Sequence, residues 1–229
     1  MNDFEQPQPS SQPPPQPALP WEAPQRWLAG FYPTFWWIAR YPSRTFSLPA
    51  AGGPLRPALF VAVLALHLEL ISQALAWALT PGVGLAELPS IIAVGLMNGM
   101  VQGVGAAMLA TPILSGLAHL ALRAVGRARA PYVASYRALA YTAVTSVSVL
   151  AVMIVWHLAR LAWGAESGDS LVGVVMGGLA CSLVWSLYVG GVALDAAHHC
   201  GKVTAMAAQV AAALAMILFM FGIFGVGGA

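Results

Sequence analysis

The chain has 229 residues, of which 59% are hydrophobic and only 8% are charged, with a formal net charge of +2. A soluble domain carries about 25% charged residues, so this composition excludes an ordinary soluble protein and predicts an integral membrane protein. Lys and Arg form no run of the kind that follows nucleic-acid phosphates, and Cys181 and Cys200 are expected to be free thiols.

The first 49 residues precede any long apolar run and divide into two parts. Residues 1–25 are rich in Pro, Gln and Ser and offer little to bury, which predicts a disordered, solvated tail. Residues 26–49 set Trp, Phe and Tyr side chains beside arginines, a combination that prefers the lipid headgroup layer. We expect a short interfacial helix there, broken near Pro33 or Pro42.

Five apolar segments follow, each long enough to cross about 30 Å of hydrocarbon at about 1.5 Å per residue. They lie within a membrane domain of residues 50–229 and cover about residues 57–79, 91–122, 138–157, 171–194 and 203–224. The second is too long for one straight crossing, so we expect Pro112 to kink it or its first part to lie shallow. The predicted fold is an all-α bundle of five transmembrane helices.

Basic residues are unevenly divided between the two sides that these spans define. Nine of the ten precede the first span or lie between spans two and three or spans four and five, and only Arg160 lies on the other side. The positive-inside rule then places the N-terminus in the cytoplasm and the C-terminus outside. The expected location is a bacterial cytoplasmic (inner) membrane.

Polar side chains interrupt the first span at His67, Glu69 and Gln73. An ionisable side chain at membrane depth is costly, so it should face protein or water and have a partner. We expect a packing hydrogen bond to the second span, where Asn98 and Gln102 are the available partners. The alternative is a small transporter or an ion or proton pathway centred on Glu69.

Glycines recur at four-residue spacing in two of the spans. Gly95, Gly99 and Gly103 fall on one face of span two, and Gly173 and Gly177 repeat the spacing once in span four. Such faces allow close backbone approach between membrane helices, so we expect helix packing or self-association at both.

Span three begins with aromatic and basic side chains. Tyr132, Tyr136, Arg137 and Tyr141 are expected to anchor this helix at the headgroup layer. The alternative is an anionic-lipid site formed by the arginines around the start of this span, which are Arg123, Arg127, Arg129 and Arg137.

The stretch LDAAHHCGK, residues 194–202, joins spans four and five and sets Asp195, His198, His199 and Cys200 within six positions. A tight zinc site needs three or four converging ligands. Histidines in a last helical turn are favoured by the helix dipole even without a metal, and Gly201 follows where a helix-ending glycine is expected. We therefore expect a polar, cytoplasm-facing turn and keep weak metal binding as the alternative.

Three stretches resemble the Yip-domain family, the polytopic membrane proteins named for interaction with Rab-type GTPases. They are YPSRTFSLPAAGGPLRPALFVAVLAL, APYVASYRALAYTAVTSVSVL and VWSLYVGGVALDAAHHCGKVTAM, in the family's order across residues 40–225. The resemblance implies a five-span membrane-trafficking protein. The Asp-Leu-Tyr-Gly-Pro signature of eukaryotic members is missing before span one, which favours the prokaryotic branch.

Motifs for an ordinary hydrolase, kinase or dehydrogenase are missing from the sequence. We therefore expect a non-enzymatic scaffold or adaptor without a cofactor, which organises lipids or partner proteins in the membrane. The expected partners are membrane lipids and a membrane or cytoplasmic protein or a second copy of the chain, but no nucleic acid.

Overall fold

The computed structural model describes residues 18–23, 29–78, 84–163 and 168–225, and these residues form helices and loops without a strand. Its helices are α1 (Phe31–Arg40), α2 (Pro42–Phe46), α3 (Leu55–Ala78), α4 (Leu88–Asn98), α5 (Gly105–Ala124), α6 (Tyr132–Thr142), α7 (Ser146–Trp163), α8 (Gly168–His198) and α9 (Lys202–Gly225). Short 3₁₀ segments, η1 (Leu85–Glu87) and η3 (Ala143–Thr145), and a π-helical segment, η2 (Gly99–Val104), complete the order.

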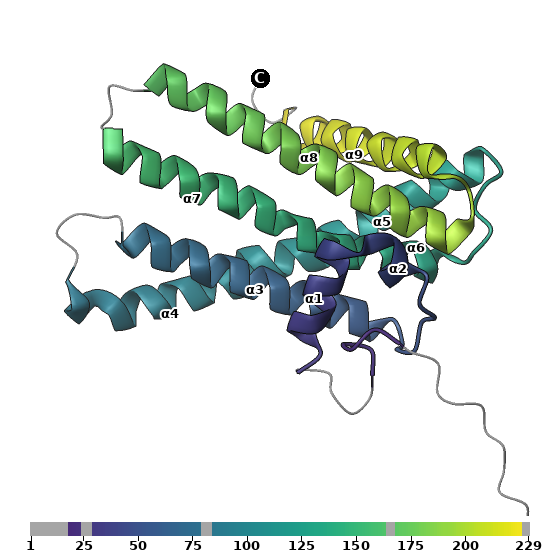
Figure 1. Ribbon diagram of the computed structural model, residues 1–229, viewed down its shortest axis with the longest axis horizontal. Helices are drawn as coiled ribbons and strands as arrows, with labels where there is room; N and C mark the ends of the chain where they lie inside the picture. The colour runs from purple at the N-terminus through teal and green to yellow at the C-terminus, as the bar shows by residue number, and fades with distance from the viewer. Residues whose placement is uncertain (1–17, 24–28, 79–83, 164–167, 226–229) are drawn as a thin grey trace, which may run out of the picture.

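Five helical units among the described residues are long and apolar enough to cross a membrane, which confirms the predicted all-α five-span fold. They are Leu55–Ala78, Leu88–Ala124, Tyr132–Ala159, Val172–His198 and Lys202–Phe219. They run alongside one another along the long axis of the molecule (Figure 1). A helix satisfies its own backbone hydrogen bonds, which is why these apolar runs can span hydrocarbon as helices.

The second span is irregular, but not at the proline that we expected to kink it. The π-helical segment η2 separates α4 from α5, whereas α5 continues through Pro112. A π-turn inserts an extra residue into the helical ladder, and Gly99 and Gly103 add no side chains to hinder it. Pro112 removes one backbone donor without ending the helix.

The N-terminal helices lie across the bundle (Figure 1). The break falls at Tyr41, directly before Pro42, and Pro33 lies in the first turn of α1. Helix α1 buries Phe31, Thr34 and Ile38. Its opposite face exposes aromatic side chains, a pattern that suits the headgroup layer; these side chains are Tyr32, Trp36 and Trp37.

Part of the expected disordered tail is ordered, which corrects the prediction for residues 18–23. Residues 1–17, 24 and 25 lie outside the described residues, but Leu19, Trp21 and Glu22 are buried in the core. The Trp21 ring packs edge-on against Phe31 and Phe60, and its Nε1–H donates to Arg56 O at 2.7 Å. Burial of the Trp21 side chain therefore orders this turn despite the polar, Pro-rich composition around it.

The glycine face of span two packs against α3. A Cβ atom placed on Gly95 would lie 3.1 Å from Gln73 Cγ, and one on Gly99 would lie 3.2 Å from Glu69 Cγ. Gly103 faces the α3 backbone at the next turn, at a wider 3.6 Å. The three glycines thus meet residues that are themselves four apart on α3, namely Gln73, Glu69 and Ala65.

Gly173 and Gly177 make no packing contact with the other described helices, because nothing outside their own helix lies within 4 Å of a Cβ placed on either of them; self-association through this face stays a prediction. Other glycines make the close contacts of α8. Gly178 lies against α7, and Gly190 and Gly191 lie against α9. The glycine spacing alone could not distinguish the packed face of α8 from its open face.

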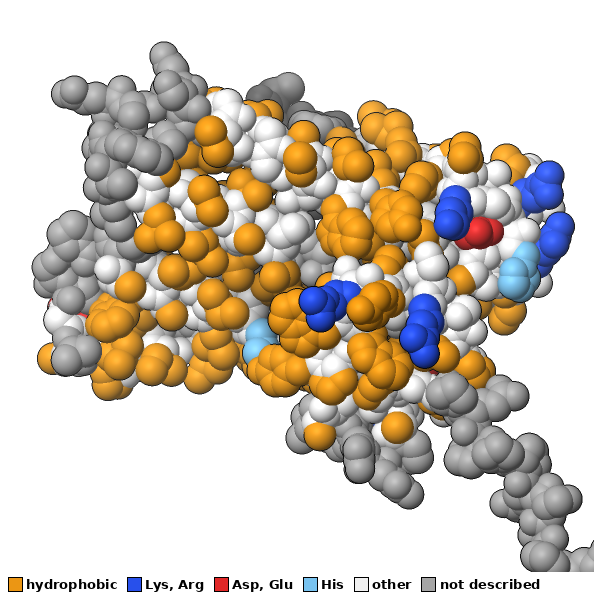
Figure 2. All heavy atoms as spheres, in the orientation of Figure 1, with side chains coloured by type: hydrophobic (Ala, Val, Ile, Leu, Met, Phe, Trp, Pro, Cys, Tyr) orange, Lys and Arg blue, Asp and Glu red, His pale blue; other side chains and the backbone are white. Residues whose placement is uncertain are grey.

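Basic side chains gather toward one end of the bundle, which we call the basic end (Figure 2). It is formed by α2, the start of α3, the α5–α6 loop of residues 125–131 and the α8–α9 turn of residues 199–201. The basic side chains that these segments or the adjoining helix ends carry are Arg44, Arg56, Arg123, Arg127, Arg129 and Lys202.

Candidate functional site at the basic end

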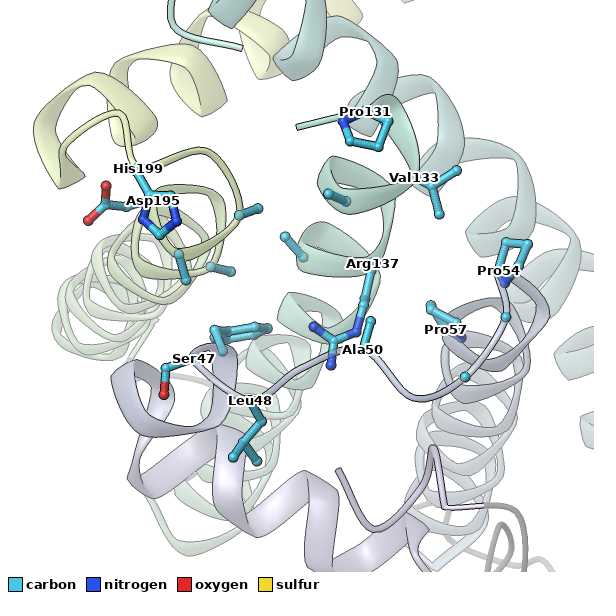
Figure 3. Close-up of a pocket in the computed structure, with 18 residues that line it drawn as sticks. Ser47, Leu48, Ala50, Pro54, Pro57, Pro131, Val133, Arg137, Asp195 and His199 are labelled. Atoms are coloured by element: carbon cyan, nitrogen blue, oxygen red, sulfur yellow. The ribbon is translucent and has the colours of Figure 1, made fainter. Parts of the chain in front are cut away.

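A cavity of about 680 Å³ lies at the basic end between the α2–α3 linker, α6 and the last turn of α8. We call it the basic-end cavity. Its walls are mostly alanine, glycine and proline, and its titratable side chains are Arg137, Asp195 and His199. Figure 3 shows Arg137 reaching from α6 toward the linker, with Asp195 and His199 across the cavity at the end of α8.

The cavity wall at Arg137 contains a buried ion pair between Arg137 and Glu22. Arg137 Nε and Nη2 donate to the two carboxylate oxygens of Glu22 at 2.6 and 2.9 Å, and Tyr141 Oη donates to Glu22 Oε1 at 3.0 Å. The backbone N–H of Ala51 adds a fourth bond at 3.2 Å. Bidentate geometry with extra donors is what makes a buried ion pair tolerable. We call Glu22, Arg137 and Tyr141 the clamp. They fasten the N-terminal turn of residues 18–23 and the α2–α3 linker to α6.

The clamp changes the expectation for two predicted headgroup residues. Tyr141 is fully buried, so it anchors nothing at the headgroup layer. The side chain of Arg137 is 14% exposed and lines the basic-end cavity. Its remaining nitrogen, Nη1, makes no hydrogen bond to any described residue. Arg137 is therefore chiefly a structural side chain with one edge turned to the cavity.

The other predicted headgroup residues are more accessible. Arg123, Arg127 and Arg129 are exposed and form no ion pair with the part of the chain that the structure describes. Gly126, at φ 67°, closes α5 by donating to Arg123 O, and Arg127 N donates to Leu122 O. This glycine-based helix end directs the chain into the basic α5–α6 loop.

The two tyrosines in the first turns of α6 both contact other side chains or helices and both remain partly exposed. Tyr132 Oη donates to the carbonyl of Pro112 at 3.0 Å, across to α5. Tyr136 is half-buried and lies 6.2 Å from the Tyr132 ring, centroid to centroid. Tyr132 therefore joins two spans, besides any role at the headgroup layer.

The polar turn after α8 is held by Asp195. The carboxylate oxygen Oδ1 accepts from Gly201 N at 2.7 Å, and Asp195 O accepts from His199 N at 2.6 Å. His199 and Gly201 both have positive φ, at 50° and 86°, a conformation that closes a helix end. Asp195 is thus occupied in shaping the turn, and His199 is left exposed beside it.

His198 points into the bundle. It is fully buried, and its Nδ1 accepts from Ala130 N at 3.1 Å, so in the neutral ring Nε2 carries the proton. Nε2 then donates to Ser135 Oγ at 2.7 Å, and Ser135 Oγ is hydrogen-bonded to His119 Nδ1 at 3.0 Å. This chain of hydrogen bonds joins α8, α6 and α5. His198 cannot act as a base toward Ser135 in this arrangement, because its Nε2 is already the donor.

The four metal candidates of this turn do not converge. The described residues contain no group of three or more His, Cys, Asp and Glu side chains placed to hold a metal ion. His198 faces inward whereas His199 faces outward, and Cys200 is buried. Burial, together with the nearby Asp195 carboxylate, raises the pKa of the Cys200 thiol, which disfavours the thiolate that binds metals. His198 is the last residue of α8, and the positive φ of His199 ends the helix there.

In the first span, Glu69 bonds to a residue of the same helix, and His67 bonds both within α3 and to α1. Glu69 Oε1 accepts from Gln73 Nε2 at 2.8 Å, so its partner is one turn away and is not the expected Asn98. The side chain of Gln102 lies outside the described residues. His67 contacts Val63 O at 2.7 Å and the hydroxyl of Tyr32 at 3.1 Å, which ties α1 to α3.

No protein-family model, no curated protein and no solved structure matches the chain. What the protein does is therefore inferred from its own residues, above all from the basic end and the cavity beside Arg137.

Proposed function

We propose that the protein is a non-enzymatic membrane scaffold that organises anionic lipids, and through them partner proteins, at its basic end. The observation that carries this proposal is the basic-end cavity of about 680 Å³ with exposed arginines on the adjoining loop. Exposed Lys and Arg beside a membrane span attract anionic headgroups by about 1 kcal/mol each. Small apolar side chains line most of the cavity, which suits the glycerol and upper acyl region of a lipid.

Several polar side chains of the described region form structural bonds, which supports a scaffold. The clamp joins the N-terminal turn to α6, Asp195 closes the turn after α8, and Ser135 links two histidines. The alternative of an ion pathway centred on Glu69 has less support, because Gln73 occupies its carboxylate and Gly99 packs against its stem.

The proposed orientation places the basic end in the cytoplasm of a bacterial inner membrane. The basic loops at that end are the basis of this assignment, since the positive-inside rule counts Lys and Arg in short loops. The resemblance of residues 40–225 to the Yip-domain family supports the same view, and membership of that family is part of the proposal.

The test is lipid retention by the purified protein. The wild type and an Arg127→Gln/Arg129→Gln variant are extracted in mild detergent, and the bound phosphatidylglycerol and cardiolipin are counted by native mass spectrometry. Loss of two headgroup-facing charges is expected to weaken retention by about 2 kcal/mol, roughly 30-fold in affinity. Arg40→Gln on α1, away from the cavity, is the matched control and should retain its lipids.

Equal retention by the double variant and the wild type would refute lipid organisation at the basic end. A protein partner that copurifies with the wild type and with Arg40→Gln, but not with the double variant, would extend the proposal from lipids to an adaptor role.

A further inference from the structure

A second cavity, of about 250 Å³ and partly open to the surroundings of the bundle, lies where α5, the α6–η3–α7 unit, α8 and α9 meet. We call it the intramembrane cavity. Gln209 is seven residues from the start of α9 and Ser186 is twelve from the end of α8, which places them roughly 10 and 18 Å from the basic end at about 1.5 Å per residue. The cavity is therefore at membrane depth and separate from the basic-end cavity.

The lining is unusually polar for this depth and carries no charged side chain. The hydrogen-bonding side chains that line it are Thr111, Thr142, Thr145, Ser146, Ser186 and Gln209. A charged ligand would have no counter-charge here, at a high desolvation cost. An uncharged ligand that forms hydrogen bonds meets no such obstacle.

Among the lining residues, Gln209 is the clearest indication of a binding site. Its side chain is 7% exposed, its Oε1 is buried without a hydrogen-bond partner, and its carboxamide makes no hydrogen bond to a described residue. The carboxamide lies against Gly190, where a methyl group would overlap it. Buried polar atoms are nearly always paired, so this amide is in place to receive a partner that both donates and accepts.

The hydroxyl pair opposite has unused capacity as well. Thr145 Oγ1 lies 2.9 Å from Thr142 O and 3.1 Å from Ser186 Oγ. One hydroxyl has one proton, so Thr145 can donate only one of these bonds at a time. Either choice leaves Ser186 with a donor or an acceptor that has no protein partner.

The third span is interrupted at this same place. The 3₁₀ segment η3, Ala143–Thr145, separates α6 from α7 and contributes Ala143 and Thr145 to the lining. Mid-helix 3₁₀ stretches often mark functional positions, and irregular backbone at membrane depth is tolerated where it lines a cavity.

We propose that the intramembrane cavity binds the hydroxyl group of a small uncharged molecule, held between the Gln209 carboxamide and the Ser186 hydroxyl. An alcohol both donates and accepts, as these two side chains require, and carries no charge to be desolvated. The hydroxyl can come from a free polyol or from an uncharged lipid such as a diacylglycerol. This site does not depend on the lipid organisation proposed for the basic end.

The experiment measures thermal unfolding of the full-length protein in detergent with three probes. They are glycerol, 1,2-dioleoylglycerol in mixed micelles, and 1,2-dioleoyl-3-acetylglycerol, which lacks the hydroxyl. We expect glycerol or dioleoylglycerol to raise the Tm of the wild type in a saturable way, and the acetylated lipid to have no such effect. The responding probe identifies the source of the hydroxyl.

The matched variants are Gln209→Met, which keeps the volume and removes the amide, and Gln73→Met on α3, outside the cavity. Gln209→Met should weaken the apparent Kd for the responding probe about tenfold or more, whereas Gln73→Met should respond like the wild type. This comparison also removes the general stabilisation that glycerol gives to any folded protein. Ser186→Ala takes the place of Gln209→Met if the latter does not fold.

Three results would overturn the proposal. They are equal stabilisation by the acetylated and hydroxyl lipids, an unchanged response in Gln209→Met or Ser186→Ala, and a wild type that responds to neither hydroxyl probe. The last result would assign the cavity to water alone.

Discussion

Glu22 shows how much one side chain can determine in this protein. Its buried carboxylate accepts four hydrogen bonds, from Ala51, Tyr141 and both donating nitrogens of Arg137. These bonds hold the N-terminal turn, the linker and α6 around one charge pair. At the scale of single residues, we expect disruption of the clamp to lower the stability of the protein most.

Glu22→Gln leaves the Arg137 guanidinium buried without a counter-charge. We expect it to lower the free energy of unfolding by about 3–5 kcal/mol, the usual effect of removing one member of a buried pair. Unfolding in mixed detergent micelles measures this change. Glu87→Gln, at an exposed position in η1, is the control and should be nearly neutral. Equal stability of the two variants would show that the clamp is unimportant.

Cys200 offers a pH-dependent readout of the turn after α8. Because burial and the Asp195 carboxylate raise its pKa, less of the thiol is ionised at any given pH, and the rise of thiolate with pH is displaced upward. In a Cys181→Ser background, iodoacetamide should therefore react more slowly with the folded protein than with the SDS-unfolded chain, and its rate should rise at higher pH. Asp195→Asn should shift this profile downward, whereas a profile identical to that of the unfolded chain would contradict the raised pKa.

At the scale of elements, two of the five spans owe their shape to short irregular segments. The π-helical η2 carries two of the three glycines that meet α3, and the 3₁₀ η3 lines the intramembrane cavity. Glycine contacts then decide how closely neighbouring spans approach. Gly99 in span two meets α3, whereas Gly177 in span four meets no other described helix, so substitutions at the two positions can be compared.

Gly99→Leu should be destabilising by about 1–3 kcal/mol, because the new side chain has to displace Glu69 or Leu66 on α3. Gly177→Leu is the matched control, since no described residue lies near that glycine, and it should be neutral or slightly stabilising as a better helix former. Thermal unfolding of both variants in one detergent compares them. Similar losses in the two would mean that the glycine face of span two is not a packing face.

The elements were predictable where local sequence decides them, and the candidate sites were not. Long apolar runs specify helical spans because no other backbone arrangement is satisfied in hydrocarbon, and the glycines of span two correctly indicated a close neighbour. Glu22 and Arg137 are 115 residues apart, and His198 and Ser135 are 63 apart, so no local pattern links them. Trp21 within a Pro-rich stretch was the one signal that could have indicated an ordered N-terminal turn.

At the scale of the whole molecule, the fold brings the basic loops to one end although they are far apart in the chain. With five spans among the described residues, the start of α3 and the end of α9 lie at opposite ends of the bundle. The proposed orientation depends on this arrangement and can be tested directly.

Single cysteines in a Cys181→Ser/Cys200→Ser background report on orientation. Arg127→Cys, at the basic end, should react with a membrane-impermeant maleimide only after the cells are opened. Glu87→Cys, at the opposite end, should react in intact cells. The reverse pattern would place the basic end outside and refute the cytoplasmic assignment.

The clamp also has a consequence for biosynthesis. Glu22 leaves the ribosome 115 residues before Arg137, a delay of roughly 6 to 23 s at about 5–20 residues per second. During that interval two spans have been made while the carboxylate has no partner, so the N-terminal turn cannot be locked before the third span arrives. The order of translation therefore places formation of this ion pair after the first two of the five spans have been made.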